Sequence, residues 1–228
     1  MPATTPLGVP KVALVVARLI IEGVDQGSRT FIVPICNERE MYKGVISLPL
    51  PPRSGTCPFD FSFTRFEDVH LPRSALLGSL SPIKASYSRE LWWQEVAALQ
   101  RGTLAISAPF ISGIKIAGYV GGLYSLRRKI LGKETIPRPI ISFRTQQWPV
   151  LQAIAVGRVL EAWYPEAIHH LQDSNSDPRI RHAISVIFKT VSIRHFQLCN
   201  SQMMERLGAI GMFPFNDLSR IDVGLSLR

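Results

Sequence analysis

The chain has 228 residues, of which 46% are hydrophobic and 19% charged, and this composition excludes a disordered protein. Its net charge of +9 favours an anionic partner, such as a nucleic acid, a phosphorylated cofactor or an acidic membrane, without choosing among them. The three cysteines, Cys36, Cys57 and Cys199, lie far apart and include no CxxC pair, so neither a disulfide framework nor a zinc site is expected.

The first third of the chain has β-strand character. Residues 11–22 are rich in valine and isoleucine on both faces, which predicts a buried strand. Residues 25–28 have the composition of a turn, and residues 30–35 form the returning strand of the predicted hairpin. Residues 45–50 are a third candidate strand. Residues 59–64 alternate phenylalanine with polar residues, which predicts a strand whose phenylalanines face the core.

From about residue 86 the pattern becomes helical. Residues 102–123 carry one charge, Lys115, and are long enough to span a membrane. Their five glycines and Pro109 instead favour a helix that packs closely inside the protein, so no membrane span is expected.

Two later helices are amphipathic. The first is predicted to face the core through residues one helical turn apart: Leu151, Ala155, Val159 and Trp163. The second begins near Pro178 and is predicted to bury an aliphatic stripe: Ile180, Ile184, Ile187, Val191 and Leu198. The opposite side of this helix is predicted to be polar: His182, Ser185, Lys189 and Ser192.

Strands that are followed by helices indicate an α+β protein. We expect a β domain over residues 1–78 and an antiparallel helical bundle over residues 79–228.

A cationic cluster, Arg127, Arg128 and Lys129, closes the apolar helix, and Gln146 and Gln147 follow at the start of the next helix. Guanidinium groups match phosphate oxygens in a planar fork, and amides both donate and accept hydrogen bonds, so the set suits a nucleotide. The same residues also fit a helix C-terminus with cations on its last carbonyl groups, a proline-rich linker and a polar first turn. The residues alone leave both interpretations open.

Gly208 and Gly211 follow the last long helix and offer a second candidate contact. Glycine permits close approach of the backbone to a nucleotide. Glycine also commonly ends a helix, so a C-cap with a second glycine in the following turn is the alternative. His195 lies on the aliphatic stripe, which is typical of a core histidine rather than a general base, and no metal site is expected.

The segment YSLRR at residues 124–128, followed by PIISFRTQQ at residues 139–147, resembles the central helical segment of acyl-CoA oxidases, the peroxisomal branch of the acyl-CoA dehydrogenase superfamily. The glycines at 208 and 211 match the family's glycine-rich turn, although Ala209 stands where a further glycine is usual. Several segments before residue 78 resemble the family's middle β domain, so the similarity covers nearly the whole chain.

This resemblance implies a partial β-barrel-like middle domain followed by an incomplete antiparallel helical bundle of acyl-CoA dehydrogenase type. It also implies an FAD-dependent oxidoreductase that dehydrogenates an acyl-CoA thioester between its α and β carbons, in a specialised, secondary-metabolite pathway. In the family a glutamate removes the α-proton while a hydride passes from the β-carbon to the flavin.

The resemblance also implies the residues of the cofactor site. By position, Arg128 matches the arginine that reaches the FAD phosphates, Gln147 matches the following glutamine with Gln146 beside it, and Gly208 and Gly211 match the glycine turn. Such contacts often cross a dimer interface in the family, which implies a homodimer or a pairing with an intact homologue.

The chain departs from the family in three respects. Arg144 stands where relatives usually have glutamine. The helical domain and the flavin-cradling β segment of the relatives would precede residue 1. The family's catalytic glutamate would lie beyond Arg228, so no catalytic residue is assigned. A catalytically incomplete member that acts as a binding or assembly subunit is therefore the alternative.

Two expectations concern the surroundings of the protein. The resemblance implies a location in the peroxisome or the cytoplasm, although the final tripeptide, Ser-Leu-Arg, is not the Ser-Lys-Leu peroxisomal address. A nucleic-acid partner is not expected, because the positive charges are spread over the chain and no recognised binding motif occurs.

Overall fold

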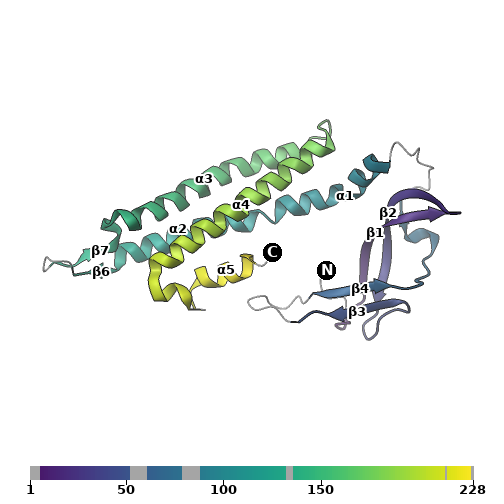
Figure 1. Cartoon of the computed structure of the whole chain (residues 1–228), viewed down its shortest axis with the longest axis horizontal. Helices are drawn as coiled ribbons and strands as arrows, with labels where there is room; N and C mark the ends of the chain where they lie inside the picture. Colours follow the sequence, from purple (N-terminus) through teal and green to yellow (C-terminus); the bar gives the residue numbers. More distant parts are fainter. Residues whose placement is uncertain (1–5, 52–60, 79–87, 132–135, 214, 227–228) are drawn as a thin grey trace. The chain divides into compact units, whose positions relative to one another are not determined.

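The computed structural model describes residues 6–51, 61–78, 88–131, 136–213 and 215–226. The chain divides into two compact units, residues 1–97 and 98–228. The first is mainly β-structure and is called the β unit; the second is helical and is called the helical unit (Figure 1). The predicted α+β class is confirmed, and the described strands form small antiparallel sheets rather than a closed barrel.

Some predictions fall outside the described residues. They concern Cys57, the first residues of the strand predicted at 59–64, and the change from strands to helices between residues 79 and 87. The domain boundary predicted at residue 78 therefore stays a prediction.

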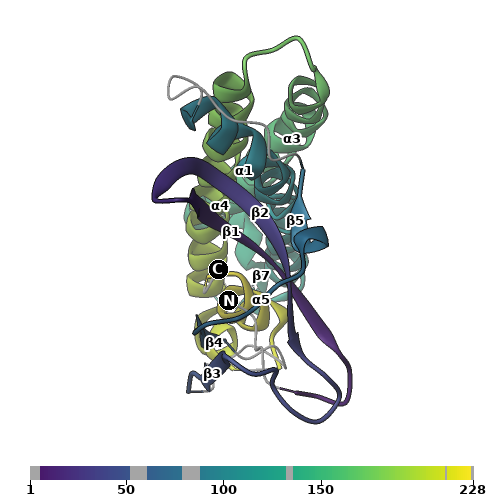
Figure 2. The same ribbon diagram turned by 90° about the vertical axis from the view of Figure 1, so that its right-hand side faces the viewer.

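The β unit is built on a long antiparallel hairpin. β1 (Lys11–Ile21) pairs with β2 (Val24–Cys36), and the short β5 (Leu76–Leu77) adds to the other edge of β2. Figure 2 shows β1 and β2 as a strongly twisted ribbon. Glu22 and Gly23 form the turn with φ values of 49° and 78°, the positive values that tight hairpins require.

Two expectations for this hairpin are wrong. The turn predicted at residues 25–28 is an irregularity inside β2, where the pairing register shifts opposite Arg18 and Gly27 takes a φ of 81°. β1 is also not buried on both faces, since Ala13 is its one buried residue. The described residues pack against the face that carries Ala13 and leave Val12 and Leu14 open.

A second sheet pairs β3 (Val45–Pro49) with β4 (Ser62–Phe66). The strand predicted at residues 59–64 is found as β4. Its phenylalanines were predicted to face the core, and this is wrong, because Phe63 is 68% exposed while Ser62 is buried. Leu48 is the cross-strand partner of Phe63, so two apolar side chains pair on the open face of the sheet.

The helical unit holds the C-terminal part of one helix and four further helices: α1 (Ser88–Ala105), α2 (Ala108–Arg127), α3 (Arg144–Gln172), α4 (Pro178–Leu207) and α5 (Asp217–Ser226). The small hairpin of β6 (Lys129–Ile130) and β7 (Arg138–Pro139) joins α2 to α3. Figure 1 shows α2, α3 and α4 side by side as long helices, with α5 beside the C-terminal part of α4.

Glycines on α2 allow these helices to approach closely. A Cβ atom on Gly113 would lie 2.7 Å from the ring of Phe196 on α4. A Cβ atom on Gly118 would lie 3.3 Å from the Cβ of Ala153 on α3. Phe196 is fully buried, so the glycine is the complement of a large aromatic side chain.

The inward stripe predicted for α3 is right only at Trp163, which packs against the core. Leu151 and Val159 are 60% and 65% exposed, and the buried positions include Ala153, Gly157 and Leu160. The helix turns its small residues toward α2 because the close approach at Gly118 leaves no room for larger ones.

The inward stripe predicted for α4 is right only in part. Ile184 and Val191 pack against the core. Ile180, Ile187 and Leu198 are exposed, whereas Ser185 and Ser192, which were predicted on the polar side, are fully buried. The inner face of α4 instead carries its aromatic residues, among them Phe188, whose ring meets Trp163 with centroids 4.7 Å apart. The rotation of α4 about its axis is therefore set by the packing of its aromatic residues and not by its aliphatic stripe.

The stretch Leu99–Arg127 is the one helical stretch of the described residues with the length and composition to cross a membrane, with a mean hydropathy of 1.4. Half of its most apolar window is buried inside the protein. Ile114 and Ala117 are fully buried there, as in a helix at the centre of a folded core.

Candidate functional site

Three chain segments meet at one end of the helical unit: the last turn of α2, the first turn of α3 and the turn after α4. They meet because α2, α3 and α4 alternate in direction, so that two C-termini and one N-terminus share an end (Figure 1). All five predicted cofactor residues lie on these segments: Arg128, Gln146, Gln147, Gly208 and Gly211. We call this region the cationic end.

The cationic end carries a group of exposed basic side chains: Arg127, Arg128, Lys129, Arg138 and Arg144. In the described part of the chain, none of these side chains forms a hydrogen bond or an ion pair. The N-terminus of α3 also lies here, and Phe143 at its N-cap provides no side-chain acceptor for the first N–H groups. Free guanidinium groups beside an uncapped helix N-terminus attract anions, and phosphate above all.

Arg128 stands at the point where α2 ends. Its backbone N–H donates to the carbonyl of Tyr124 at 2.8 Å, and its own carbonyl accepts from the N–H of Ile140 at 2.9 Å. The backbone is thereby fixed on both sides, while the guanidinium group extends into solvent. Gln147, in the first turn of α3, is similarly exposed.

Gln146 has a different environment from its neighbour. It is 8% exposed, and its Nε2 donates to Ser125 Oγ at 2.8 Å and to the carbonyl oxygen of Arg206 at 3.3 Å. Ser125 Oγ in turn donates to the carbonyl of Gly121 at 2.6 Å. One amide therefore joins α2, α3 and α4, and the resemblance gave no sign of this role.

The two glycines differ in their surroundings. Gly208 ends α4 with a φ of 66°, and a Cβ atom there would touch nothing within 4 Å. Gly211 is buried, and a Cβ atom there would lie 2.5 Å from the carbonyl oxygen of Met204. The close approach expected at Gly211 is thus made to the last turn of α4 itself, as in a C-cap followed by a tight turn.

Two asparagines that sequence reasoning missed hold the turn after α4. Asn216 Nδ2 donates to the carbonyl of Ile210 at 3.1 Å, and its Oδ1 accepts from the N–H of Leu218 at 3.0 Å. Asn200, fully buried, donates to the carbonyl of Leu218 at 3.2 Å. Their signal in the sequence is slight, because a single asparagine is common in turns and caps.

The turn also exposes apolar side chains. The rings of Phe213 and Phe215 stack with centroids 5.5 Å apart and an angle of 13°, and both are exposed. Met212 beside them is 76% exposed. The cationic end therefore combines free positive charge with flat apolar surface, which suits a ligand that has an aromatic ring and an anionic group.

Among the described residues of the helical unit, the other titratable groups do not form a catalytic set. The described residues contain no group of three His, Cys, Asp or Glu side chains that could hold a metal ion. Asp217 pairs with Arg220 at 3.6 Å, and Asp222 accepts from Asn200 at 3.0 Å. His195 is half-buried in α4.

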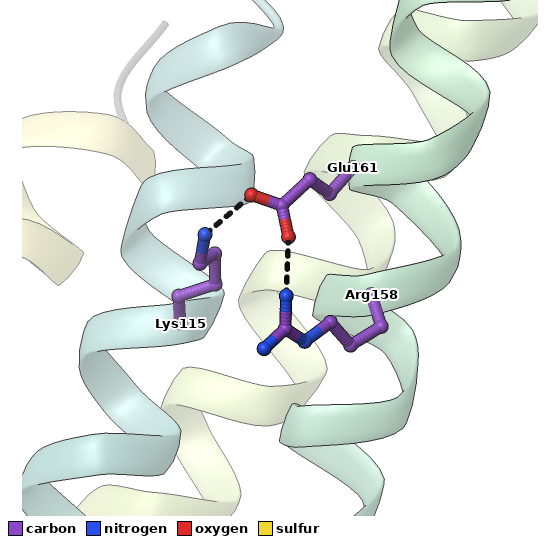
Figure 3. Close-up of polar contacts among 3 residues, drawn as sticks. All are labelled: Lys115, Arg158 and Glu161. Carbon is purple, nitrogen blue, oxygen red and sulfur yellow. Dashed lines mark hydrogen bonds and ion pairs between the residues drawn. The ribbon is translucent and has the colours of Figure 1, made fainter.

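Lys115, the one charge in the apolar helix, has a structural partner. Its Nζ lies 2.5 Å from Glu161 Oε1 on α3, and Arg158 reaches the second oxygen of the same carboxylate at 3.3 Å (Figure 3). The hydrogen bond from Lys115, with the charges of both cations, holds the pKa of Glu161 below its ordinary value. These two ion pairs fasten α2 to α3 and give each of the three charged groups a partner within the protein.

No family model matches the chain. A curated mouse protein, described as an acyl-coenzyme A oxidase-like protein, is 32% identical over 131 residues, which are 53% of this chain and 20% of the mouse protein.

Solved structures share the fold over nearly the whole chain. An acyl-CoA oxidase from Yarrowia lipolytica matches with a TM-score of 0.76 at 18% identity, over 95% of this chain and 35% of its own. Butyryl-CoA dehydrogenase from Megasphaera elsdenii matches with a TM-score of 0.71 at 14% identity, over 95% and 51%. Nitroalkane oxidase, whose structure was solved with nitrooctane, matches with a TM-score of 0.76 at 14% identity, over 95% and 50%. The chain thus spans a fifth of the curated relative and about a third to a half of these structures.

Proposed function

We propose that the chain belongs to the superfamily of acyl-CoA oxidases and acyl-CoA dehydrogenases, and that it forms the cofactor-binding helical part of an FAD-dependent acyl-CoA oxidoreductase. The observation that supports FAD most directly is the cationic end, where free guanidinium groups, an uncapped helix N-terminus and exposed aromatic rings lie together. A flavin dinucleotide has the matching features, a diphosphate and two planar ring systems.

Each predicted residue has a role in this proposal. Arg128 binds the diphosphate, because its backbone is fixed while its guanidinium group is free. Gln147 contributes an exposed amide to a polar edge of the cofactor. Gln146 is a positioning residue, because its Nε2 is already bound to Ser125 and to the carbonyl of Arg206. Gly208 and Gly211 shape the turn that passes beside the cofactor.

Bound FAD would supply the acceptor for a hydride from the acyl chain. The residues of this chain would bind and orient the dinucleotide through charge and shape. No base is assigned among them. The choice between oxidase and dehydrogenase, the specialised acyl chain and a peroxisomal or cytoplasmic location are parts of the proposal that rest on the resemblance and on the oxidases among the relatives.

Binding of FAD tests this function directly. We expect titration of FAD with the purified protein, followed by flavin fluorescence anisotropy, to saturate, and we expect ADP to compete. Arg128→Gln removes one charge-assisted phosphate contact and should weaken binding by about ten-fold. Arg179→Gln removes another exposed charge, at the start of α4, and should leave the affinity unchanged. Absence of saturable binding, or equal losses in the two variants, would refute the proposed site.

A second candidate function is that of a binding or assembly subunit that pairs with an intact homologue. The observation that favours it is the outward aliphatic face of α3 and α4, where Leu151, Val159 and Ile187 are exposed although the sequence pattern predicts them inside. Apolar surface of this kind marks a protein interface.

A further inference from the structure

A groove in the β unit has the features of a second binding site. It has a volume of about 570 Å³, which lies in the range of small-molecule sites. Pro34, Val69 and Leu71 contribute apolar walls, and Lys43, Asp68 and His70 bring polar groups to the same groove.

The two walls of the groove are fixed against each other by the backbone. The N–H of Glu67 donates to the carbonyl of Gly44 at 2.8 Å, and the N–H of Tyr42 donates to the carbonyl of Ile35 at 2.9 Å. Gly44 has a φ of 81°, and a Cβ atom at this position would collide with the carbonyl oxygen of Glu67. Glycine is therefore required where the loop that carries Lys43 crosses the segment that carries Asp68 and His70.

Asp68 adds a further constraint, because it is one of two described non-glycine residues with a positive φ, here 47°. A left-handed backbone at such a residue costs free energy and is frequent at ligand sites. The strained residue lies on the wall of the groove itself.

The polar groups of the groove are not satisfied by the protein. In the described part of the β unit, the side chains of Lys43, Asp68 and His70 form neither hydrogen bonds nor ion pairs. The neighbouring carboxylate of Glu67 is already paired with Arg65 at 2.6 Å. An ammonium group and an imidazole thus stand beside apolar walls, and neither is paired with the carboxylate of Asp68 that shares the groove.

We propose that this groove binds a small organic molecule that has an apolar body and one carboxylate group. The carboxylate is held by Lys43 and His70, both of which can donate hydrogen bonds to it, and the body lies against Pro34, Val69 and Leu71. Asp68 limits the affinity for anions by its like charge. The inference concerns the β unit alone and does not depend on FAD binding at the cationic end.

Isothermal titration with phenylbutyrate, and with phenylbutyramide as its neutral analogue, tests the inference. The carboxylate should bind saturably and more tightly than the amide. Lys43→Gln should weaken phenylbutyrate binding by about five-fold, the scale of a solvent-exposed charge contact. Asp68→Asn should strengthen it by about two-fold, because a like charge is removed. Arg39→Gln, an exposed charge outside the groove, should leave it unchanged.

The opposite signs for Lys43 and Asp68 distinguish this site from general attraction to a basic protein. If Arg39→Gln weakened binding as much as Lys43→Gln, only the net charge would matter and the inference would be overturned. Equal affinity for the amide and the carboxylate, or undetectable binding of phenylbutyrate, would overturn it as well. FAD titration of the Lys43→Gln variant should match that of the unmodified protein. A failure of carboxylate binding in the groove can therefore be distinguished from a failure of FAD binding at the cationic end.

Discussion

At the residue scale, the sequence predicts the location of Gln146 at the candidate site, but it does not predict the hydrogen bonds that this side chain forms within the protein. The resemblance marks it as a cofactor contact, and it does lie beside the last turn of α4. Its amide, however, joins Ser125 and the backbone of Arg206. The hydrogen bond between Gln146 and Ser125 depends on how α2 and α3 pack against each other. The spacing of residues along the sequence does not give this information.

We expect Gln146→Ala to lower the free energy of unfolding by about 1–3 kcal/mol, because buried groups on two neighbouring helices lose their donor. The measurement is urea unfolding followed by circular dichroism. Gln147→Ala, at the exposed neighbouring position, should change the same quantity by less than about 0.5 kcal/mol. Similar losses in the two variants would contradict the positioning role.

The carboxylate of Glu161 predicts a pH dependence. Its pKa in the folded protein is held below the ordinary value of 4.5 by the hydrogen bond from Lys115 and the nearby charges. Because folding lowers this pKa, the ionised group stabilises the protein above that value, and this contribution is lost as the pH falls below it.

We therefore expect Glu161→Gln to lower the melting temperature slightly at pH near neutrality and to have no effect in strong acid, where the native carboxyl is protonated too. Thermal unfolding at both pH values provides the measurement. Glu166→Gln, an exposed acid without an ion pair on the same helix, is the control and should show no such difference. If Glu161→Gln lowered the melting temperature equally at both pH values, the loss of the ion pair would be excluded as the cause.

At the element scale, the sequence predicts the long strands and helices well and their orientation poorly. The hairpin and the helices after residue 88 are confirmed, and the strand predicted at 59–64 is found as β4 at Ser62–Phe66. The predicted inward faces of β4, α3 and α4 differ from the observed ones, because an apolar pattern in the sequence does not distinguish a face that packs in the core from an apolar face that is exposed. What decides the rotation of α4 is the match of Phe196 to Gly113, a contact between two distant positions.

This contact gives a prediction for α2. Gly113→Ala places a methyl group 2.7 Å from the ring of Phe196 and should destabilise the protein by about 1–3 kcal/mol through overpacking. Gly102→Ala lies in α1 with no atom within 4 Å and should stabilise it by about 0.5–1 kcal/mol, since alanine favours the helix. Urea unfolding of both variants measures the difference, and stabilisation by both would show that α2 and α4 do not pack so closely.

At the scale of the whole molecule, the candidate site stays a prediction, although its five residues gather on three segments at one end of the helical unit. The sequence suggests them through resemblance, and the alternating helix directions explain why they meet. The open aliphatic faces of α3 and α4 could not be foreseen, because periodicity places those residues in a core.

The outward face predicts association with a second copy or with an intact homologue. We expect sedimentation velocity to show self-association, and a variant with Leu151→Glu and Val159→Glu to be monomeric, because two charges would be buried in the interface. A variant with Ser174→Glu and Asn175→Glu, at exposed polar positions of the loop between α3 and α4, adds the same charge away from the aliphatic face and should associate normally. A native protein that is monomeric alone and with the homologue would contradict the assembly role.

The position of β1 in the sheet has a consequence for handling the protein. Among the described strands it pairs only with β2, so no described strand covers its other edge, and exposed valine and leucine side chains lie along it. Such a strand recruits further chains into cross-β aggregates, and nothing in its sequence beyond Lys11 and Arg18 counteracts this. The yield of native protein should therefore be limited by fibril formation at β1 before it is limited by thermal unfolding of the helices.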